Sequence, residues 1–118
     1  MKIKLGELRD MCSGITELLK AGIPARLYFK FKKLLNKLVG ELQAFEETRL
    51  ELCKKYCEKE NGKPVMVNGN FQIEDTEKFT EEFMELANTE TEIEFEPVPI
   101  GEVGDVPITL ATERFFKE

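Results

Sequence analysis

The sequence predicts a mainly α protein: a helical hairpin with one long central helix, a third packing helix and minor β structure, namely a short β-hairpin and a C-terminal extended arm. Residues 25–59 contain no proline and a single glycine, which is typical of one long helix. Asn68-Gly69 is the dipeptide that favours a tight β-hairpin turn. Four apolar residues recur every seven positions within the long stretch: Phe31, Leu38, Phe45 and Leu52.

Length and composition indicate one domain. The chain has 118 residues, of which 42% are hydrophobic, so a packed core is expected. We divide it into a helical hairpin (1–60), a turn and β-hairpin (61–75), a helix (76–89) and an acidic extended arm with a short terminal helix (90–118). No long apolar run suits a membrane span, and the start of the chain lacks signal-peptide features. With three cysteines, an odd number, a cytoplasmic protein is expected, in the host cytoplasm or in a virion if a phage encodes it.

The first helix is expected from about Leu5 to Lys20. Gly14 weakens its interior or permits a neighbouring helix to approach closely. Gly22 suits the residue after a helix end and Pro24 the first turn of the next helix, so the two helices should run antiparallel. Its apolar residues alternate at spacings of three and four, which places them on one face: Leu5, Leu8, Cys12, Ile15 and Leu19.

The second helix is too long for the first one to cover. About 35 residues span ~50 Å, whereas the ~16 residues of the first helix span only ~24 Å. Burying a large apolar side chain contributes about 1.5–3 kcal/mol, so the uncovered residues should find another partner. The residues in question are Phe45, Leu50, Leu52, Cys53 and Tyr56.

A third helix is predicted from Asp75 or Thr76, either of which can cap it, to about Asn88. Phe79 and Phe83 lead its apolar stripe, and its ~20 Å would cover the far half of the second helix. A second copy of the chain could provide the same cover. Before it, Asn61-Gly62 and Pro64 predict a break in the chain, and short strands flank Asn68-Gly69.

From Thr91 the pattern changes to a period of two, which indicates a strand or extended arm with one acidic face. Three prolines and two glycines predict irregular structure from there to about residue 108. A short helix over 109–116 should carry Leu110, Phe115 and Phe116, and the two phenylalanines are expected to dock on an apolar surface. The acidic residues of the arm are Glu92, Glu94 and Glu96.

The residue types that are missing exclude most catalytic arrangements. The chain has no histidine and one serine, so it lacks the imidazole base of Ser-His-Asp and Cys-His sites. Neither glycine-rich nucleotide-binding motif is present, and we expect no enzyme activity, cofactor or metal. Cys53 and Cys57 lie one helical turn apart and could be thiolate ligands. We interpret them as small buried apolar residues, since a structural zinc site needs four ligands and Cys12 should lie ~30 Å away.

Charge divides the chain into two halves. Residues 1–63 carry a net charge of +5 and residues 64–118 a net charge of −11, which favours a contact between the halves, within one chain or between chains. A basic stripe follows one side of the second helix: Arg26, Lys30, Lys33 and Lys37. The stripe is either a solvated helix face or a docking site, and the Glu90–Glu96 arm is its simplest acidic partner.

Three aromatic residues interleaved with lysines are similar to the basic and aromatic patches that bind single-stranded nucleic acid: Tyr28, Phe29 and Phe31, with Lys30, Lys32 and Lys33. The chain as a whole has a pI near 4.9 and would repel phosphate, and these residues point in different directions around a helix. Nucleic acid is therefore the less favoured partner, and the glutamates that follow argue against a membrane surface.

Three segments resemble a group of small proteins of unknown function encoded in the structural-gene clusters of tailed bacteriophages and prophages. They are MKIKLGEL at the start, IPARLYFKFKKLLNKL and ELQAFEETRLELCKKY, and the later acidic helix and proline-containing arm look similar too. The resemblance implies a virion-assembly, tail or accessory role and no catalytic residues. We therefore expect a non-enzymatic structural or assembly protein acting through helix-mediated contacts, as a homo-oligomer or with other phage structural proteins. The length of the second helix also fits a coiled-coil hairpin. The alternative is a small nucleic-acid-associated regulator that uses the basic stripe.

Overall fold

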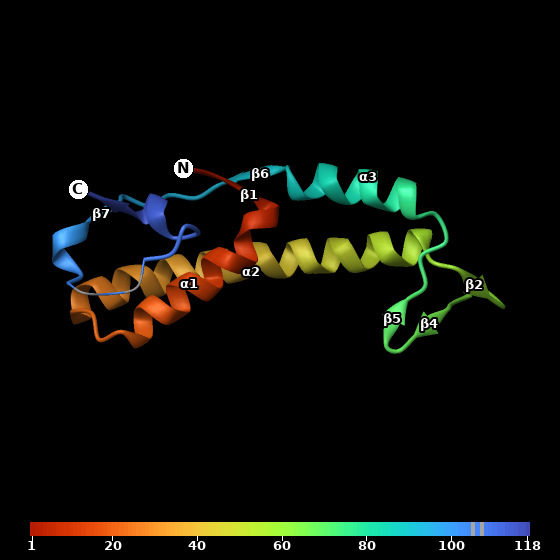
Figure 1. The fold of residues 1–118 in the computed structure, drawn as a ribbon, viewed down its shortest axis with the longest axis horizontal. Coiled ribbons are helices and arrows are strands. Elements are labelled where there is room, and N and C mark those ends of the chain that lie inside the picture. Colours follow the sequence, from red (N-terminus) through yellow and green to blue (C-terminus); the bar gives the residue numbers. More distant parts are fainter. Residues whose placement is uncertain (105, 107) are drawn as a thin grey trace.

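The predicted fold class is confirmed by a computed structural model, which describes residues 1–104, 106 and 108–118. The long central helix α2 runs through the length of the molecule, whose extents are 58 × 25 × 19 Å. Figure 1 shows α1 beside one half of α2 and α3 beside the other half. The three α-helices are α1 (Leu8–Lys20), α2 (Ala25–Tyr56) and α3 (Thr76–Ala87).

The turn between α1 and α2 is as predicted. Gly22 has a φ of +79°, a conformation that a residue without Cβ adopts freely. Pro24 directly precedes α2, and its carbonyl accepts hydrogen bonds from the amides of Leu27 and Tyr28. The predicted start at Leu5 was too early for an α-helix, because Leu5–Glu7 forms a 3-10 turn, η1. There the Leu5 amide donates to the Thr89 carbonyl, which ties this turn to the end of α3.

The strand predicted in the acidic arm has a partner that periodicity did not reveal. Strand β6 (Glu90–Glu92) pairs antiparallel with β1 (Lys2–Lys4) at the start of the chain. The register places Lys2 opposite Glu92 and Lys4 opposite Glu90, so opposite charges face each other across the strands. Between them Ile3 is fully buried.

Helix α3 packs on the far half of α2, as the length argument predicted, but Leu50, which was also expected to be covered, stays 40% exposed. The rings of Phe45 on α2 and Phe83 on α3 lie 6.1 Å apart, and Phe79 stacks on Phe83 at the same distance. The Asp75 side chain accepts a hydrogen bond of 3.0 Å from the Lys78 amide and caps α3. Helix α2 ends at Tyr56, three residues before the predicted end, because Cys57 is extended and bridges to Ile73.

The tip beyond α2 contains two β-hairpins, of which only the second was predicted. Strands β4 (Met66–Val67) and β5 (Asn70–Phe71) flank the expected Asn68-Gly69 turn. The stretch that was predicted as a break forms another hairpin, β2 (Lys59–Glu60) with β3 (Lys63–Pro64) around Asn61-Gly62. All four turn residues have positive φ, as two-residue hairpin turns require.

Backbone hydrogen bonds join the two hairpins into one unit. The Glu58 amide donates to the Gln72 carbonyl, the Gln72 amide to the Val65 carbonyl, and the Val65 amide to the Glu58 carbonyl. These bonds form a closed ring that uses one residue from each of three chain segments. The tip is therefore a small structured cap at the end of the rod, as Figure 1 shows on the right.

The C-terminal segment docks on the opposite end of the rod. Strand β7 (Val98–Pro99) pairs in parallel with β8 (Phe116–Lys117), and two 3-10 turns, η2 (Ile100–Glu102) and η3 (Glu113–Phe115), lie between them. The predicted short helix over 109–116 is thus confined to one 3-10 turn. The stretch predicted to be irregular contains β7 and η2, and its residues 105 and 107 lie outside those described.

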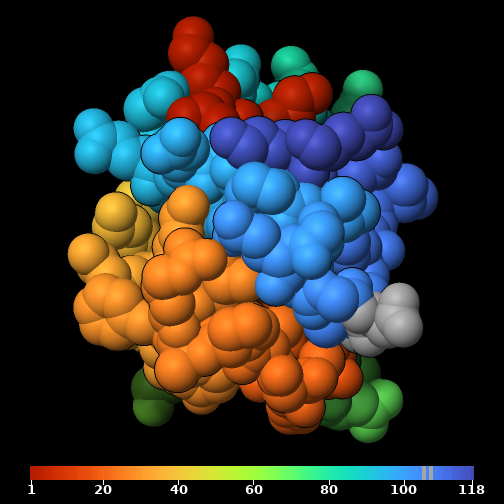
Figure 2. Space-filling view, turned by 90° about the vertical axis from the view of Figure 1, so that its left-hand side faces the viewer, coloured from red at the N-terminus to blue at the C-terminus, as the bar shows by residue number. Residues whose placement is uncertain are grey.

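The main core lies where α1, the first half of α2, the arm and the C-terminal segment meet. Phe31 is fully buried, with its ring 5.4 Å from Phe95 and 5.5 Å from Phe116. Gly14 permits a close approach here, although not by a helix: a Cβ on it would lie 2.5 Å from Cγ2 of Thr112 in the C-terminal segment. Figure 2 looks at this end of the molecule and shows the C-terminal segment packed beside the first turns of α2.

Candidate interaction surfaces

The basic stripe of α2 and the acidic arm lie together within one chain. The Lys30 ammonium donates a 2.8 Å hydrogen bond to the Glu96 carbonyl and sits 4.9 Å from the centre of the Phe95 ring. These contacts use the backbone and ring of the arm rather than its carboxylates. Arg26 forms an ion pair of 3.1 Å with Glu102, further along the C-terminal segment. The two halves of the chain therefore do contact each other, as their charges led us to expect. The contact of Lys30 uses a carbonyl and an aromatic ring of the arm instead of the arm's carboxylates.

A shallow groove of about 350 Å³ separates α2 from the arm. Lys33 and Lys37 line it from α2, and Glu94 and Glu96 line it from the arm. Glu92, the third predicted acidic residue, turns to the amino terminus, whose nitrogen lies 2.9 Å from its Oε1. Acidic side chains therefore border the lysines that a nucleic-acid site would need.

Part of the basic surface remains available for a partner. Within the described part of the chain, no carboxylate lies at ion-pair distance from Lys32, Lys33 or Lys37. The Lys33 ammonium lies 5.7 Å from the centre of the Phe29 ring, and Phe29 itself is 67% exposed. This stretch of α2 combines unpaired positive charge with exposed aromatic surface.

The far half of the rod is a single layer of two helices. Among the described residues, none on α3 is fully buried, and Leu52, Tyr56, Phe79 and Phe83 are all half-buried. One groove of about 460 Å³ runs between Leu52 on α2 and Leu86 on α3. The predicted apolar contact residues of this half do meet, but they remain partly accessible from solvent.

The two terminal phenylalanines behave differently from these. Phe115 is fully buried, with its ring 5.4 Å from that of Phe95, and Phe116 packs on Phe31. Both dock inside their own chain, whereas the prediction left open which apolar surface they use. Leu110, which was expected beside them, is 90% exposed.

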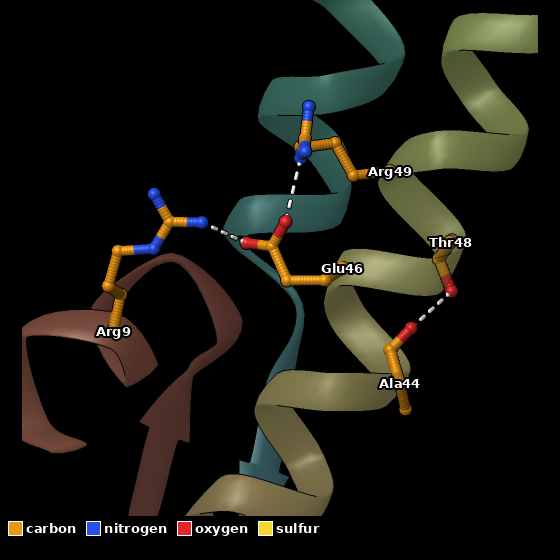
Figure 3. A network of polar contacts seen from close by, with 5 residues as sticks. All are labelled: Arg9, Ala44, Glu46, Thr48 and Arg49. Atoms are coloured by element: carbon orange, nitrogen blue, oxygen red, sulfur yellow. Dashed lines mark hydrogen bonds and ion pairs between the residues drawn. The ribbon is translucent and has the colours of Figure 1, made fainter.

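A polar cluster links α1 to the middle of α2 (Figure 3). The carboxylate of Glu46 accepts hydrogen bonds from Arg9 on α1 and, at 3.0 Å, from Arg49 on its own helix. Partial burial alone would raise the pKa of Glu46, but the hydrogen bonds and charges of the two arginines outweigh it and lower the pKa. The cluster thus pairs one ionised carboxylate with two arginines where the two halves of the rod meet.

A second polar contact joins α2 to α3. The Lys55 ammonium lies 3.1 Å from Oε1 of Glu82, and the Tyr56 ring is 5.1 Å away. The Tyr56 hydroxyl and the Lys55 ammonium lower the pKa of Glu82. All three side chains border solvent, so this contact orients the helices and contributes little to stability.

The cysteines are buried, in line with their interpretation as small apolar residues. Burial raises the pKa of the Cys12 thiol, and Cys57 donates to the Lys54 carbonyl at 3.3 Å. No group of three or more cysteine, aspartate or glutamate side chains is placed to hold a metal ion in residues 1–104, 106 and 108–118.

Several exposed apolar residues were not singled out from the sequence. On α2 these include Val39, and on α3 Met84, each of which points away from its packed neighbour. Met66 and Val67 are exposed on the second hairpin of the tip. On the two helices, the sequence could have revealed these exposed residues, because Val39 and Met84 lie off the apolar stripe of their helix. For the hairpin, the short strands concealed which face is open.

Across the described residues, no helix has the length and apolar content needed to cross a membrane. Comparison of the chain with protein-family models, with curated proteins and with solved structures finds no match.

Proposed function

We propose that the chain is a non-enzymatic structural or assembly protein, of the kind encoded in the structural-gene clusters of tailed phages. It works through contacts that its helices make with further copies of itself or with other structural proteins. One observation carries the proposal: the far half of the rod is a single two-helix layer whose apolar seam stays half-buried. Apolar side chains in such a layer gain stability when another helix covers them.

The shape of the molecule supports the same proposal. A rod of 58 × 25 × 19 Å exposes much surface for its mass and offers separate contact regions at its two ends and along its sides. Exposed apolar side chains are spread over α2, α3 and the tip rather than gathered around one deep cavity. This distribution suits repeated protein contacts better than the binding of one small ligand.

The test is to co-express the chain with the products of the genes on either side of its own and to measure the mass of each purified species by light scattering. We expect a stable complex with at least one of them, or a homo-oligomer. Met84→Glu, on the outer side of α3, should weaken such a complex, whereas Leu110→Glu on the C-terminal segment serves as the matched control. A chain that stays monomeric alone and with every neighbouring product contradicts the proposal.

A small nucleic-acid-associated regulator is the second candidate, favoured by the unpaired lysines and the exposed Phe29 on α2. It predicts binding of DNA or RNA that weakens as salt rises and is lost in Lys30→Glu/Lys33→Glu. Fluorescence anisotropy with a labelled oligonucleotide measures this directly. We rank it second because Glu94 and Glu96 border the same lysines.

A further inference from the structure

We propose that a second copy of the chain docks antiparallel along the exposed side of α2 and forms a two-fold symmetric dimer. The inference rests on the proposed function and names the partner for one of its contacts. We call this surface the open face of α2. It consists of six residues: Lys33, Lys37, Gly40, Ala44, Glu47 and Glu51.

The open face is a continuous stripe on one side of the helix. Its members follow Lys33 at steps of 4, 7, 11, 14 and 18 residues, which is the spacing of a single helix face. All six residues are exposed, and a Cβ added at Gly40 would meet nothing within 4 Å. Because successive residues turn by about 100°, Lys33 points away from the side on which Phe31 is buried. The stripe is therefore exposed along its length. Lys33 and Lys37 also border the groove toward the arm, and Glu51 lies 3.4 Å from Lys54 of its own helix, a solvent-exposed pair that a partner's lysine can replace.

Basic and acidic residues occupy different halves of α2, so that two copies of this helix can attract each other. Residues 25–40 hold five basic and no acidic residues, whereas residues 41–51 hold four glutamates and one arginine. On the open face, two lysines lie before the middle of the helix and two glutamates lie after it. An acidic stretch beside a basic one repels a phosphate backbone, so a second copy fits this face better than a nucleic acid.

An antiparallel arrangement matches these charges pair by pair. With the two-fold axis midway between Gly40 and Ala44, Lys37 faces the partner's Glu47, and Lys33 faces the partner's Glu51. Symmetry repeats both contacts, so one interface contains four opposite-charge pairs. A parallel pairing in register would instead set like charges against each other, because each lysine would meet its own copy. Charge thus selects the antiparallel orientation.

The side chains at the centre of this arrangement permit close contact. Gly40 and Ala44 are the smallest residues of the face, and the distance between packed helices depends on the side chains at their crossing. Val39 is exposed on the flank of the helix, about 100° around from Gly40, so the centre of the contact consists of the two small residues alone. Phe29 lies one turn before Lys33 and extends the contact toward the end of each helix.

The test uses light scattering and sedimentation on the full chain at low and high salt. Wild type should have twice the 13.6 kDa mass of one chain at low salt and dissociate as salt screens the exposed charges. The variants Lys33→Glu/Lys37→Glu and Glu47→Lys/Glu51→Lys should each be monomeric, with helix content unchanged by circular dichroism. Mixing the two variants should restore a dimer, because every reversed charge then meets its opposite.

Two controls carry the same change in net charge elsewhere on the surface. Lys59→Glu/Lys63→Glu alters the exposed tip, and Glu77→Lys/Glu81→Lys alters exposed positions one turn apart on α3. Both should remain dimeric. The quadruple variant, which exchanges all four charges of the open face within one chain, should dimerise by itself.

The outcomes separate this inference from the proposed function. A wild-type oligomer whose mass is unaffected by the open-face variants overturns the antiparallel dimer and leaves the assembly proposal standing on another surface. A wild type that is monomeric at low salt also overturns it, and the assembly proposal is then judged by the neighbouring gene products alone. Failure of the mixture to dimerise, when both single variants are folded, overturns the charge pairing. Loss of oligonucleotide binding without a change in mass assigns the lysines to nucleic acid instead.

Discussion

The two halves of α2 carry the same seven-residue apolar pattern but differ in what covers them. In the near half, Phe31 is fully buried among α1, the arm and the C-terminal segment. In the far half, Phe45 is buried at the edge of the main core, with its ring 6.1 Å from that of Phe83 on α3, and Leu52 on the same line is only half-buried. An apolar heptad therefore specifies the side on which a helix packs. The number of neighbours on that side depends on the rest of the chain.

The largest expected effect compares one aromatic residue from each half. Phe31→Ala removes a ring from the fully enclosed core and should lower the free energy of unfolding by about 3–5 kcal/mol. Phe83→Ala removes a half-buried ring from α3 and should lower it by roughly half as much, because water already reaches part of that site. Urea unfolding followed by circular dichroism measures both values. Equal losses would show that the two halves are packed alike.

Gly14→Ala is expected to have an intermediate effect, confined to the near half. The new Cβ would lie 2.5 Å from Cγ2 of Thr112, so the C-terminal segment must shift, at a cost of about 1–3 kcal/mol. Thr112→Ser removes that methyl group and keeps the hydroxyl that contacts Thr109. The double variant should thus be more stable than Gly14→Ala, by the same urea assay. If adding Thr112→Ser only lowers stability further, the methyl contact is not the cause.

The smallest expected effect lies where the two halves meet. The lowered pKa of Glu46 means that its pairing with Arg9 and Arg49 stabilises the fold above the ordinary glutamate pKa of about 4.3. This contribution is lost as the pH falls through the lower folded-state value. Glu46→Gln should cost up to about 1 kcal/mol at pH 7, and the difference from wild type should shrink below pH 4.

The matched control for that measurement is Glu77→Gln, at an exposed position on α3. Thermal unfolding of the three proteins between pH 3 and pH 7 provides the comparison. A difference between Glu46→Gln and wild type that persists unchanged at pH 3 would contradict an electrostatic origin. It would indicate that the side chain acts through packing.

Much of the helical fold could be predicted because its signals are local. The α1–α2 turn follows from Gly22 and Pro24, and the Asp75 cap marks the start of α3. The need to cover Phe45 followed from helix lengths alone, and α3 meets it. The hairpin around Asn61-Gly62 was missed, because its two-residue strands contain a proline and lack an apolar alternation.

The candidate surfaces were predicted only in part. The basic stripe and the acidic arm were identified, but Lys30 meets a backbone carbonyl and an aromatic ring of the arm rather than a carboxylate. Likewise, the arm pairs with β1 at the opposite end of the chain. Formal charge indicates that two segments attract each other, but it does not say which atoms come into contact.

The sequence by itself determined the three α-helices, to within a few residues at their ends, and the shortage of cover along α2, because these depend on residues a few positions apart. Only the tertiary structure decided that Lys2–Lys4 meets Glu90–Glu92, that Thr112 rests on Gly14 and that the open face of α2 stays bare. The first two of these features are contacts between segments that lie about 90–100 residues apart in the sequence. They arise from the shape of the packed helices as a whole, which no local pattern records.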